Sequence, residues 1–360
     1  MAEACLGDGE YAARVVRRRT LLGPARPLGE LPTLEGASWA RAPQTTTDAS
    51  VTVALGAEGC VETLNLVDPW RDELELYRAS GMSDDLVWAG PIIDLSADPN
   101  GGTATVMAKD PSAWFAKRVL LTDFIHEDVD LATIVAEYLA YAFATDDPGI
   151  SVETTPTGIL GTRTVAATDL KRLDTELAEL ARTGVDWTVT GRTFWIGGVE
   201  VAGRTVVLPT RLVDQAFAVP PTVRLSGADM VNEAHVRGNG VQGAYGGPDP
   251  QDGVLLQDVR DEQSIEDQAS ADASAATWWD RGHEPAYYVE GENQLAPDAP
   301  VEVQTLIPGV LVPVDLDGGG VLPYQGRLRL ESLSGNYSAD GEALTVALQP
   351  IGTVTPAEAA

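Results

Sequence analysis

The sequence reads VWAGPIIDLSADPNGGTATVMAKDP over residues 87–111 and LPYQGRLRLESLSGNYSADGEALTVALQP over residues 322–350. In each stretch an aromatic residue and a glycine two positions later precede a short apolar strand, a polar turn and a strand that ends in proline. This alternation around Asn, Asp and Gly turns is typical of β-hairpins. A shift of 236 residues places Trp88 on Tyr324. Both stretches are therefore predicted to be hairpins, related either by duplication or by their common turn pattern.

Composition limits the kind of protein that this chain can be. Its 360 residues, 44% of them hydrophobic, allow about two or three domains with substantial cores. Lys and Arg total 24 against 54 Asp and Glu, which gives a net charge of −30. Surfaces that hold nucleic acid neutralise phosphates with clustered cations, so stable binding of nucleic acid is not expected. A negative wall that repels DNA is compatible with its passage in transit.

The chain is expected to be made and assembled in the cytoplasm. The N-terminal sequence MAEACLGDGEYAARVVRRR places acids before its basic run and lacks an apolar core, so it does not resemble a signal peptide. The apolar stretch LATIVAEYLAYAFA is interrupted by Glu137, and no membrane insertion is expected. Cys5 and Cys60 are expected to be free thiols, and their spacing leaves open whether they lie near each other.

Residues 1–119 are predicted to form a first small antiparallel β-barrel. Alternating strands are expected at 50–55, 74–77, 87–93 and 103–108, with turn residues between them, which is typical of a small barrel or sandwich. Residues 14–19 contain four arginines and form the basic cluster of the chain. Pairing of these arginines with acids of a neighbouring surface is favoured over a nucleic-acid patch.

Residues 120–219 are predicted to form an α+β domain. A first helix is expected to begin at a cap formed by Asp128 or Asp130, because apolar residues follow at three- and four-residue steps. A second helix is expected to begin near Thr168 and Asp169, and a tight hairpin is expected over residues 186–196.

Residues 220–360 are predicted to form a second barrel, related to the first and interrupted by a helical excursion. The boundary is placed at the Pro220-Pro221 pair. The expected elements are strands at 222–225 and 234–237, a helix near 265–278 within an insertion at about 246–299, and final strands that open at 301–307. The fold class is therefore α+β and mainly β, with two related small barrels and an α+β domain between them.

Two apparent binding motifs are weak. Residues 238–243 match G-x-G-x-x-G after a predicted strand, but Gly246-Gly-Pro follows where a dinucleotide site requires a helix N-terminus. The run that begins at Asp315 has the start of a calcium loop without its later ligands, so a turn is favoured. No cofactor-binding and no metal-binding residue is assigned.

No catalytic residue is assigned either. His126, His235 and His283 are far apart in the sequence and lie in no metal-ligand spacing. His126-Glu-Asp has the residue types for acid–base work, but three polar residues before a helix more commonly cap it. The sequence also lacks a G-x-S-x-G elbow and a Cys/His signature.

Several phrases, in this order, resemble minor tail proteins of long-tailed phages of actinobacteria, in the tail hub or baseplate hub family. They are VWAGPII at 87–93, TVMAKDP at 105–111 with Trp114, DLATIV at 130–135, LARTGVDWTV at 180–189 and LIPGVLVPV at 306–314. The resemblance covers nearly the whole chain, and each phrase alone is short.

The resemblance implies a structural virion protein at the distal end of the tail, the tail tip. Hub proteins of this family are homotrimers whose subunits each carry two related barrels, so that three chains present six similar faces to a six-fold tail tube. The implied partners are the distal tail or tail tube protein, the tape measure protein and a tip or fibre protein, with DNA only in transit. Many tail-tip proteins continue into a fibre or wall-degrading domain, whereas this sequence stops soon after Pro350.

Two other classes remain open at this stage. A cell-wall polysaccharide hydrolase would use two of the many carboxylates in a cleft. A carbohydrate-binding or adhesive β-module of the tail tip is the other alternative. The hub is favoured over both, and the chain is not expected to be an enzyme.

Overall fold

The computed structural model describes residues 9–19, 23–80, 83–197, 211–248, 253–262 and 268–350. The protein is mainly β, with 49% strand and 18% helix in several sheets, as the sequence predicted. It divides into two compact units. The first comprises residues 1–220, 291–315 and 326–348, and the second comprises residues 221–290, 316–325 and 349–360. The chain thus first leaves unit 1 between Pro220 and Pro221.

Among the described residues, a twelve-stranded sheet forms the body of unit 1. Its path runs β13, β20, β21, β3, β4, β7, β6, β5, β1, β2, while β22 pairs with β21 and β19 pairs with β22. In chain order its strands are β1 (Glu10–Arg17), β2 (Arg26–Leu31), β3 (Leu34–Arg41), β4 (Asp48–Ala54), β5 (Asp72–Ser80), β6 (Ser83–Asp98), β7 (Thr103–Lys109), β13 (Leu212–Val213), β19 (Glu292–Gln294), β20 (Leu311–Leu316), β21 (Tyr324–Ser338) and β22 (Gly341–Pro350). The short helix α1 (Cys60–Leu64) lies between β4 and β5 in the chain.

The two stretches that read alike are hairpins, as predicted. The first is β6–β7, with its turn at residues 99–102, and the second is β21–β22. They flank the β3–β4 pair in one sheet, because β7 pairs with β4 and β21 pairs with β3, where Leu333 lies opposite Arg41. The strands that the structure describes form no closed barrel. One continuous sheet therefore joins the two hairpins.

Strand β6 is long enough to take part in both halves of this sheet. Its first half pairs with β5 as far as Pro91, opposite Glu73, and from Ile92 onward it pairs with β7. A register shift follows Ile92, which is the kind of irregularity that lets a strand turn a corner. Trp39 Nε1 of β3 donates to the hydroxyl of Tyr11 on β1 at 3.0 Å, which joins two strands that are not neighbours in the sheet.

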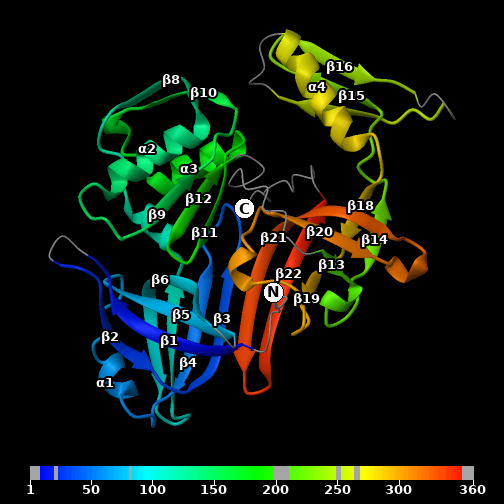
Figure 1. The fold of residues 1–360 in the computed structure, drawn as a ribbon. Helices are drawn as coiled ribbons and strands as arrows, with labels where there is room; N and C mark the ends of the chain where they lie inside the picture. Colours follow the sequence, from blue (N-terminus) through cyan, green and yellow to red (C-terminus); the bar gives the residue numbers. More distant parts are fainter. Residues whose placement is uncertain are drawn as a thin grey trace. The chain divides into compact units, whose positions relative to one another are not determined.

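The region between β7 and β13 forms an α+β layer within unit 1. Its elements are β8 (Phe124–Asp130), α2 (Leu131–Phe143), β9 (Ser151–Thr154), β10 (Leu160–Val165), α3 (Leu173–Arg182), β11 (Asp186–Thr190) and β12 (Thr193–Gly197). Strands β11, β12 and β9 make one sheet, beside which α2 and α3 lie, and β8 pairs with β10 (Figure 1). The predicted hairpin over 186–196 is confirmed as β11–β12.

One helix start was predicted correctly and the other was not. Asp130 caps α2, and its carboxylate accepts a hydrogen bond from the Ala132 amide at 2.9 Å. The second helix does not begin near Asp169: residues 167–169 form a 3₁₀ turn, and α3 begins at Leu173. The reason is Leu170, whose φ of 50° is left-handed and cannot continue a right-handed helix.

Two further expectations are corrected by local structure. His126, Glu127 and Asp128 do not cap a helix, because they lie within strand β8. Residues 301–307 do not open a strand but contain a 3₁₀ turn at Val303–Thr305, and the next strand is β20. The carbonyls of Val303 and Leu306 accept hydrogen bonds from the side chain of Arg41, not from a neighbouring strand.

In its described part, unit 2 contains two small sheets and one helix. Strands β14 (Val223–Ser226) and β18 (Ala286–Val289) form one sheet, and β15 (Glu233–Arg237), β16 (Gln242–Gly246) and β17 (Gln257–Asp261) form the other. The second sheet and helix α4 (Gln268–Gly282) make a small module with its own core. Helix α4 packs on β15 and β16 around Val231, Ala234, Val236, Ala275 and Trp278 (Figure 1). The G-x-G-x-x-G sequence covers the turn between β15 and β16 and the first two residues of β16, so a strand and not a helix follows the turn.

The two cysteines are only partly described. Cys60, at the start of α1, is buried and free, whereas Cys5 lies outside the described residues.

Gly90 marks a close approach inside the first hairpin. A Cβ at this position would lie 1.9 Å from the carbonyl oxygen of Lys109, which is backbone and cannot move aside. Gly90→Ala is expected to destabilise the fold by about 1–3 kcal/mol, because overpacking forces the strands apart. Urea denaturation measures this change. Gly56→Ala is the control, because nothing lies within 4 Å of its Cβ; equal midpoints for the two variants would contradict the packing argument.

Candidate functional site

The basic cluster at residues 14–19 is neutralised inside the chain. Its ion pairs are Arg14–Glu30 at 3.3 Å, Arg17–Asp72 at 2.8 Å, Arg18–Asp146 at 2.8 Å and Arg19–Asp147 at 3.7 Å. The prediction that these arginines pair with acids is confirmed. Arg18 and Arg19 also tie β1 to the loop after α2, so the cluster fastens the α+β layer to the main sheet.

Two buried carboxylates strengthen the same connection. Arg192, in the β11–β12 turn, pairs with Glu73 and, at 3.1 Å, with Glu75 of β5. Asp186 of β11 pairs with Arg329 of β21. Burial raises the pKa of Glu73 and of Asp186, while the neighbouring guanidinium groups act in the opposite direction. In both acids the facing arginine opposes the larger effect of burial.

Arg41 is the most unusual charged residue of the sheet. It is 1% exposed, and its guanidinium donates to the carbonyl oxygen of Val87 at 2.6 Å and to those of Val303 at 3.0 Å and Leu306 at 3.2 Å. The ring of Trp39 lies 5.1 Å from it. Burial lowers the pKa of Arg41 to about 10. One side chain thus joins β3, the first hairpin and the segment that precedes β20.

A second buried network joins the two ends of the described chain. Arg78 of β5 pairs with Glu342 of β22 at 2.6 Å, and the same carboxylate accepts from the hydroxyl of Tyr11 at 2.6 Å. The amide of Gly9 donates to it at 3.1 Å. Burial, followed by the charge of Glu342, raises the pKa of the Tyr11 hydroxyl. The start of β1 is therefore held to the second hairpin.

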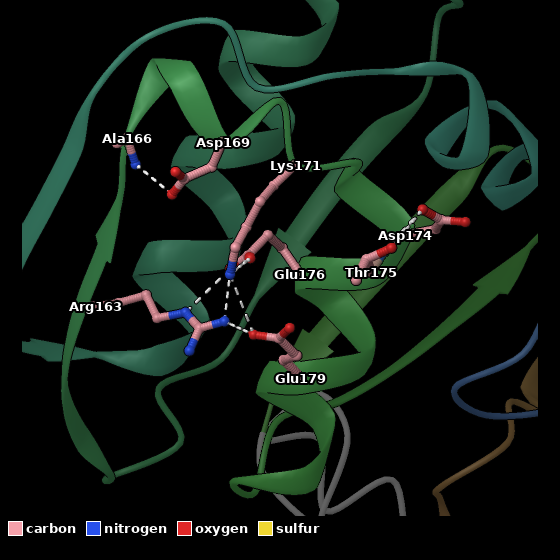
Figure 2. A network of polar contacts seen from close by, with 8 residues as sticks. All are labelled: Arg163, Ala166, Asp169, Lys171, Asp174, Thr175, Glu176 and Glu179. Carbon is pink, nitrogen blue, oxygen red and sulfur yellow. Dashed lines mark hydrogen bonds and ion pairs between the residues drawn. The ribbon is translucent and has the colours of Figure 1, made fainter.

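Figure 2 shows a third network, between β10 and α3 of the α+β layer. Arg163 of β10 reaches Glu176 of α3 at 2.9 Å and also pairs with Glu179. Lys171 lies 2.6 Å from the other oxygen of Glu176. Glu176 is fully buried, and its charge, after burial itself, raises the pKa of nearby Tyr138 to about 12. This network attaches β10 to α3.

The histidines do not come together. His126 is buried and lies 2.8 Å from Glu137 of α2, whereas His235 is in β15 and His283 follows α4. Within the described ranges no group of three His, Cys, Asp or Glu side chains is placed to hold a metal ion. The arrangement is one of structural ion pairs. Arg41, Arg192 and Glu176 were missed by sequence reasoning. For Arg41 and Glu176 the signal was a charged residue inside an alternating strand and on an apolar helix face, whereas Arg192 lies in a turn and carried no such signal.

No helix in the described part of the chain is long and apolar enough to cross a membrane. No known family profile matches the chain. No curated protein matches it in sequence.

Solved structures do match. The 43 kDa tail protein of prophage MuSo2 from Shewanella oneidensis has a TM-score of 0.60 at 12% identity, with 94% of this chain and 97% of that chain covered. A tail protein from Neisseria meningitidis MC58 has a TM-score of 0.60 at 13% identity, with 95% and 97% covered. A chain of the Francisella PdpA–VgrG complex has a TM-score of 0.55 at 10% identity, with 99% of this chain and 55% of that chain covered. The chain therefore has the fold of phage tail proteins.

Removing the Arg41 guanidinium should destabilise the fold. Arg41→Met removes a donor from three interior carbonyl groups, of which that of Val303 keeps the Leu306 amide at 3.2 Å, and the expected loss is about 2–4 kcal/mol in the free energy of unfolding. Arg14→Met is the matched control, because Arg14 is partly exposed and its change should stay within about 0.5 kcal/mol. Chemical denaturation of both variants measures the difference, and similar losses would show that Arg41 is not special.

The Asp146 pairs predict a pH dependence. Hydrogen bonds and charge from Arg18, and then from Arg118, lower the pKa of Asp146 below its ordinary 3.8. A lowered pKa in the folded state contributes stability that is present above 3.8 and is lost as the pH falls through the folded-state value. The gap in melting temperature between the wild type and Asp146→Asn should therefore narrow from about pH 6 to about pH 3. A gap that stays constant would contradict the linkage.

Proposed function

We propose that this protein is a structural component of a phage tail, a trimeric hub at the distal end of the tail tube. The observation that carries the proposal is the likeness to the two tail proteins over nearly the full length of both chains. At 12–13% identity this likeness supports the fold, and the role follows from it as a hypothesis.

The presence of two similar hairpins in each chain explains why a trimer would fit a six-fold tube. Hairpins β6–β7 and β21–β22 stand on either side of the β3–β4 pair. In the proposed assembly, residues 1–119 and residues 220–360 each supply one barrel-like face, and residues 120–219 lie between them in the chain. Three copies would then present six similar faces to a six-fold tube, because a closed ring requires equivalent contacts around its axis.

The proposed partners follow from this position. The hub would contact the distal tail or tail tube protein on one side and a tip or fibre protein on the other, and it would surround the path of the tape measure protein and of DNA. The net charge of −30 supports a wall from which DNA is repelled in transit. A complex of a similarly folded chain, that of PdpA with VgrG, supports contact with other tail-like components. In the virion, the protein would lie at the tail tip.

Light scattering after size exclusion tests the trimer. We expect a species of three 38.0 kDa chains, and we expect its fraction to rise with added salt, because salt screens the repulsion between chains of charge −30. Co-expression with a tail tube protein should retain the trimer on the end of tube assemblies seen by electron microscopy. A stable dimer whose population does not respond to salt would overturn the proposal.

A further inference from the structure

Strand β10 is an open edge on the α+β layer. Among the strands that the structure describes it pairs with β8 alone, in antiparallel register from Leu160 opposite Asp130 to Val165 opposite Phe124. An edge strand presents a row of backbone donors and acceptors to which another chain can pair. The side of β10 away from β8 is therefore available for an added strand.

Strands β8 and β10 form a two-stranded ribbon, in which β8 is protected against pairing with another chain and β10 is not. Strand β8 carries a bulge, because Glu127 and Asp128 stand against Thr162 alone, and Asp128 is left-handed with a φ of 53°. Its exposed acids also discourage pairing. Strand β2 begins with Arg26 and Pro27, which are further devices that block an edge.

The one charged residue of β10, Arg163, does not point outward from the strand. The side chain of Arg163 turns to Glu176 and Glu179 of α3, where Lys171 completes the network (Figure 2). The outward side chains of the strand are Leu160, Thr162 and Thr164, all exposed and uncharged. Leu160 is 65% exposed, and Ile125, opposite Thr164 on β8, is 70% exposed. The outward face of β10 itself is thus apolar or β-branched throughout, as a pairing strand requires.

The edge is also held rigid. Val165 is buried in the core of the layer, and a Cβ on Gly161 would lie 2.4 Å from the side chain of Leu131, so β10 packs closely on α2. The ion pairs of Arg163 fix it to α3. A strand that is already ordered loses little conformational entropy when a partner pairs with it.

Charge selects the occupant. Residues 120–197 contain thirteen Asp and Glu against five Lys and Arg, and the exposed acids Asp123, Glu127 and Asp128 lie in or beside the ribbon. A second copy would bring the same acids against the first, whereas a cationic chain would be attracted. We propose that β10 is the docking edge for an extended, Lys- or Arg-bearing segment of a different protein, which adds as a further strand. This inference rests on the ribbon itself and holds whether or not the chain is a trimeric hub.

Peptide binding tests the proposal on the full-length protein. The probe is fluorescein-labelled KTVKVTVK, and the charge-reversed control is ETVEVTVE. Fluorescence anisotropy at low salt should show binding of the Lys peptide at least about tenfold tighter than that of the Glu peptide. Hydrogen exchange should show new protection over residues 160–165 with the Lys peptide, because an added strand pairs with their amides.

Two variants test whether the peptide binds at β10. Thr164→Lys places a cation on the outward face of β10 and should weaken the Lys peptide at least about tenfold, since like charges directly opposite are destabilising. Val259→Lys, at an exposed aliphatic residue of β17, is the matched control and should leave binding unchanged. Equal binding of both peptides, equal loss in both variants, or protection of residues 160–165 by self-association of the protein alone would each overturn the proposal.

Discussion

The buried guanidinium of Arg41 is the constraint on which the sheet depends. Burial of a cation without a carboxylate partner is unfavourable, so its hydrogen bonds must be made by backbone carbonyls held at fixed positions. Those carbonyls belong to β6 and to residues 303–306, and Arg41 itself lies opposite Leu333 of the second hairpin. The first hairpin and the turn before β20 therefore share one polar centre, and it lies on a strand that pairs with the second hairpin.

Much of the local structure could be predicted, because its causes are local. The β6–β7 turn, the β11–β12 turn and the Asp130 cap are set by residues within a few positions of one another. The prediction of where α3 begins was wrong because Leu170 adopts a left-handed conformation that glycine usually takes. No residue type in the sequence therefore indicated that the helix could not begin earlier. Residues 301–307 have the composition of a strand, but a donor from far away in the sequence takes their carbonyls.

The continuity of the sheet and the identity of the ion-pair partners could not be read from the chain. The sequence indicated that the arginines of residues 14–19 would meet acids, but with 54 acids present it could not choose Asp72 or Asp146. Likewise, nothing near Arg163 distinguishes a strand whose charge turns inward from one whose charge faces solvent. Such choices are made by the packing of α3 against β10, which is a long-range property.

The pairing of β3 with β21 sets the order in which the molecule can be completed during synthesis. These partners are separated by roughly 290 residues, so β3 leaves the ribosome long before its neighbour exists, at a rate of about 5–20 residues per second. For about 15–60 s the nascent chain holds β4 on one side of β3 and an open edge on the other. Because an unpaired edge invites pairing between chains, the same arrangement that unites the finished sheet makes the unfinished one prone to self-association on crowded polysomes.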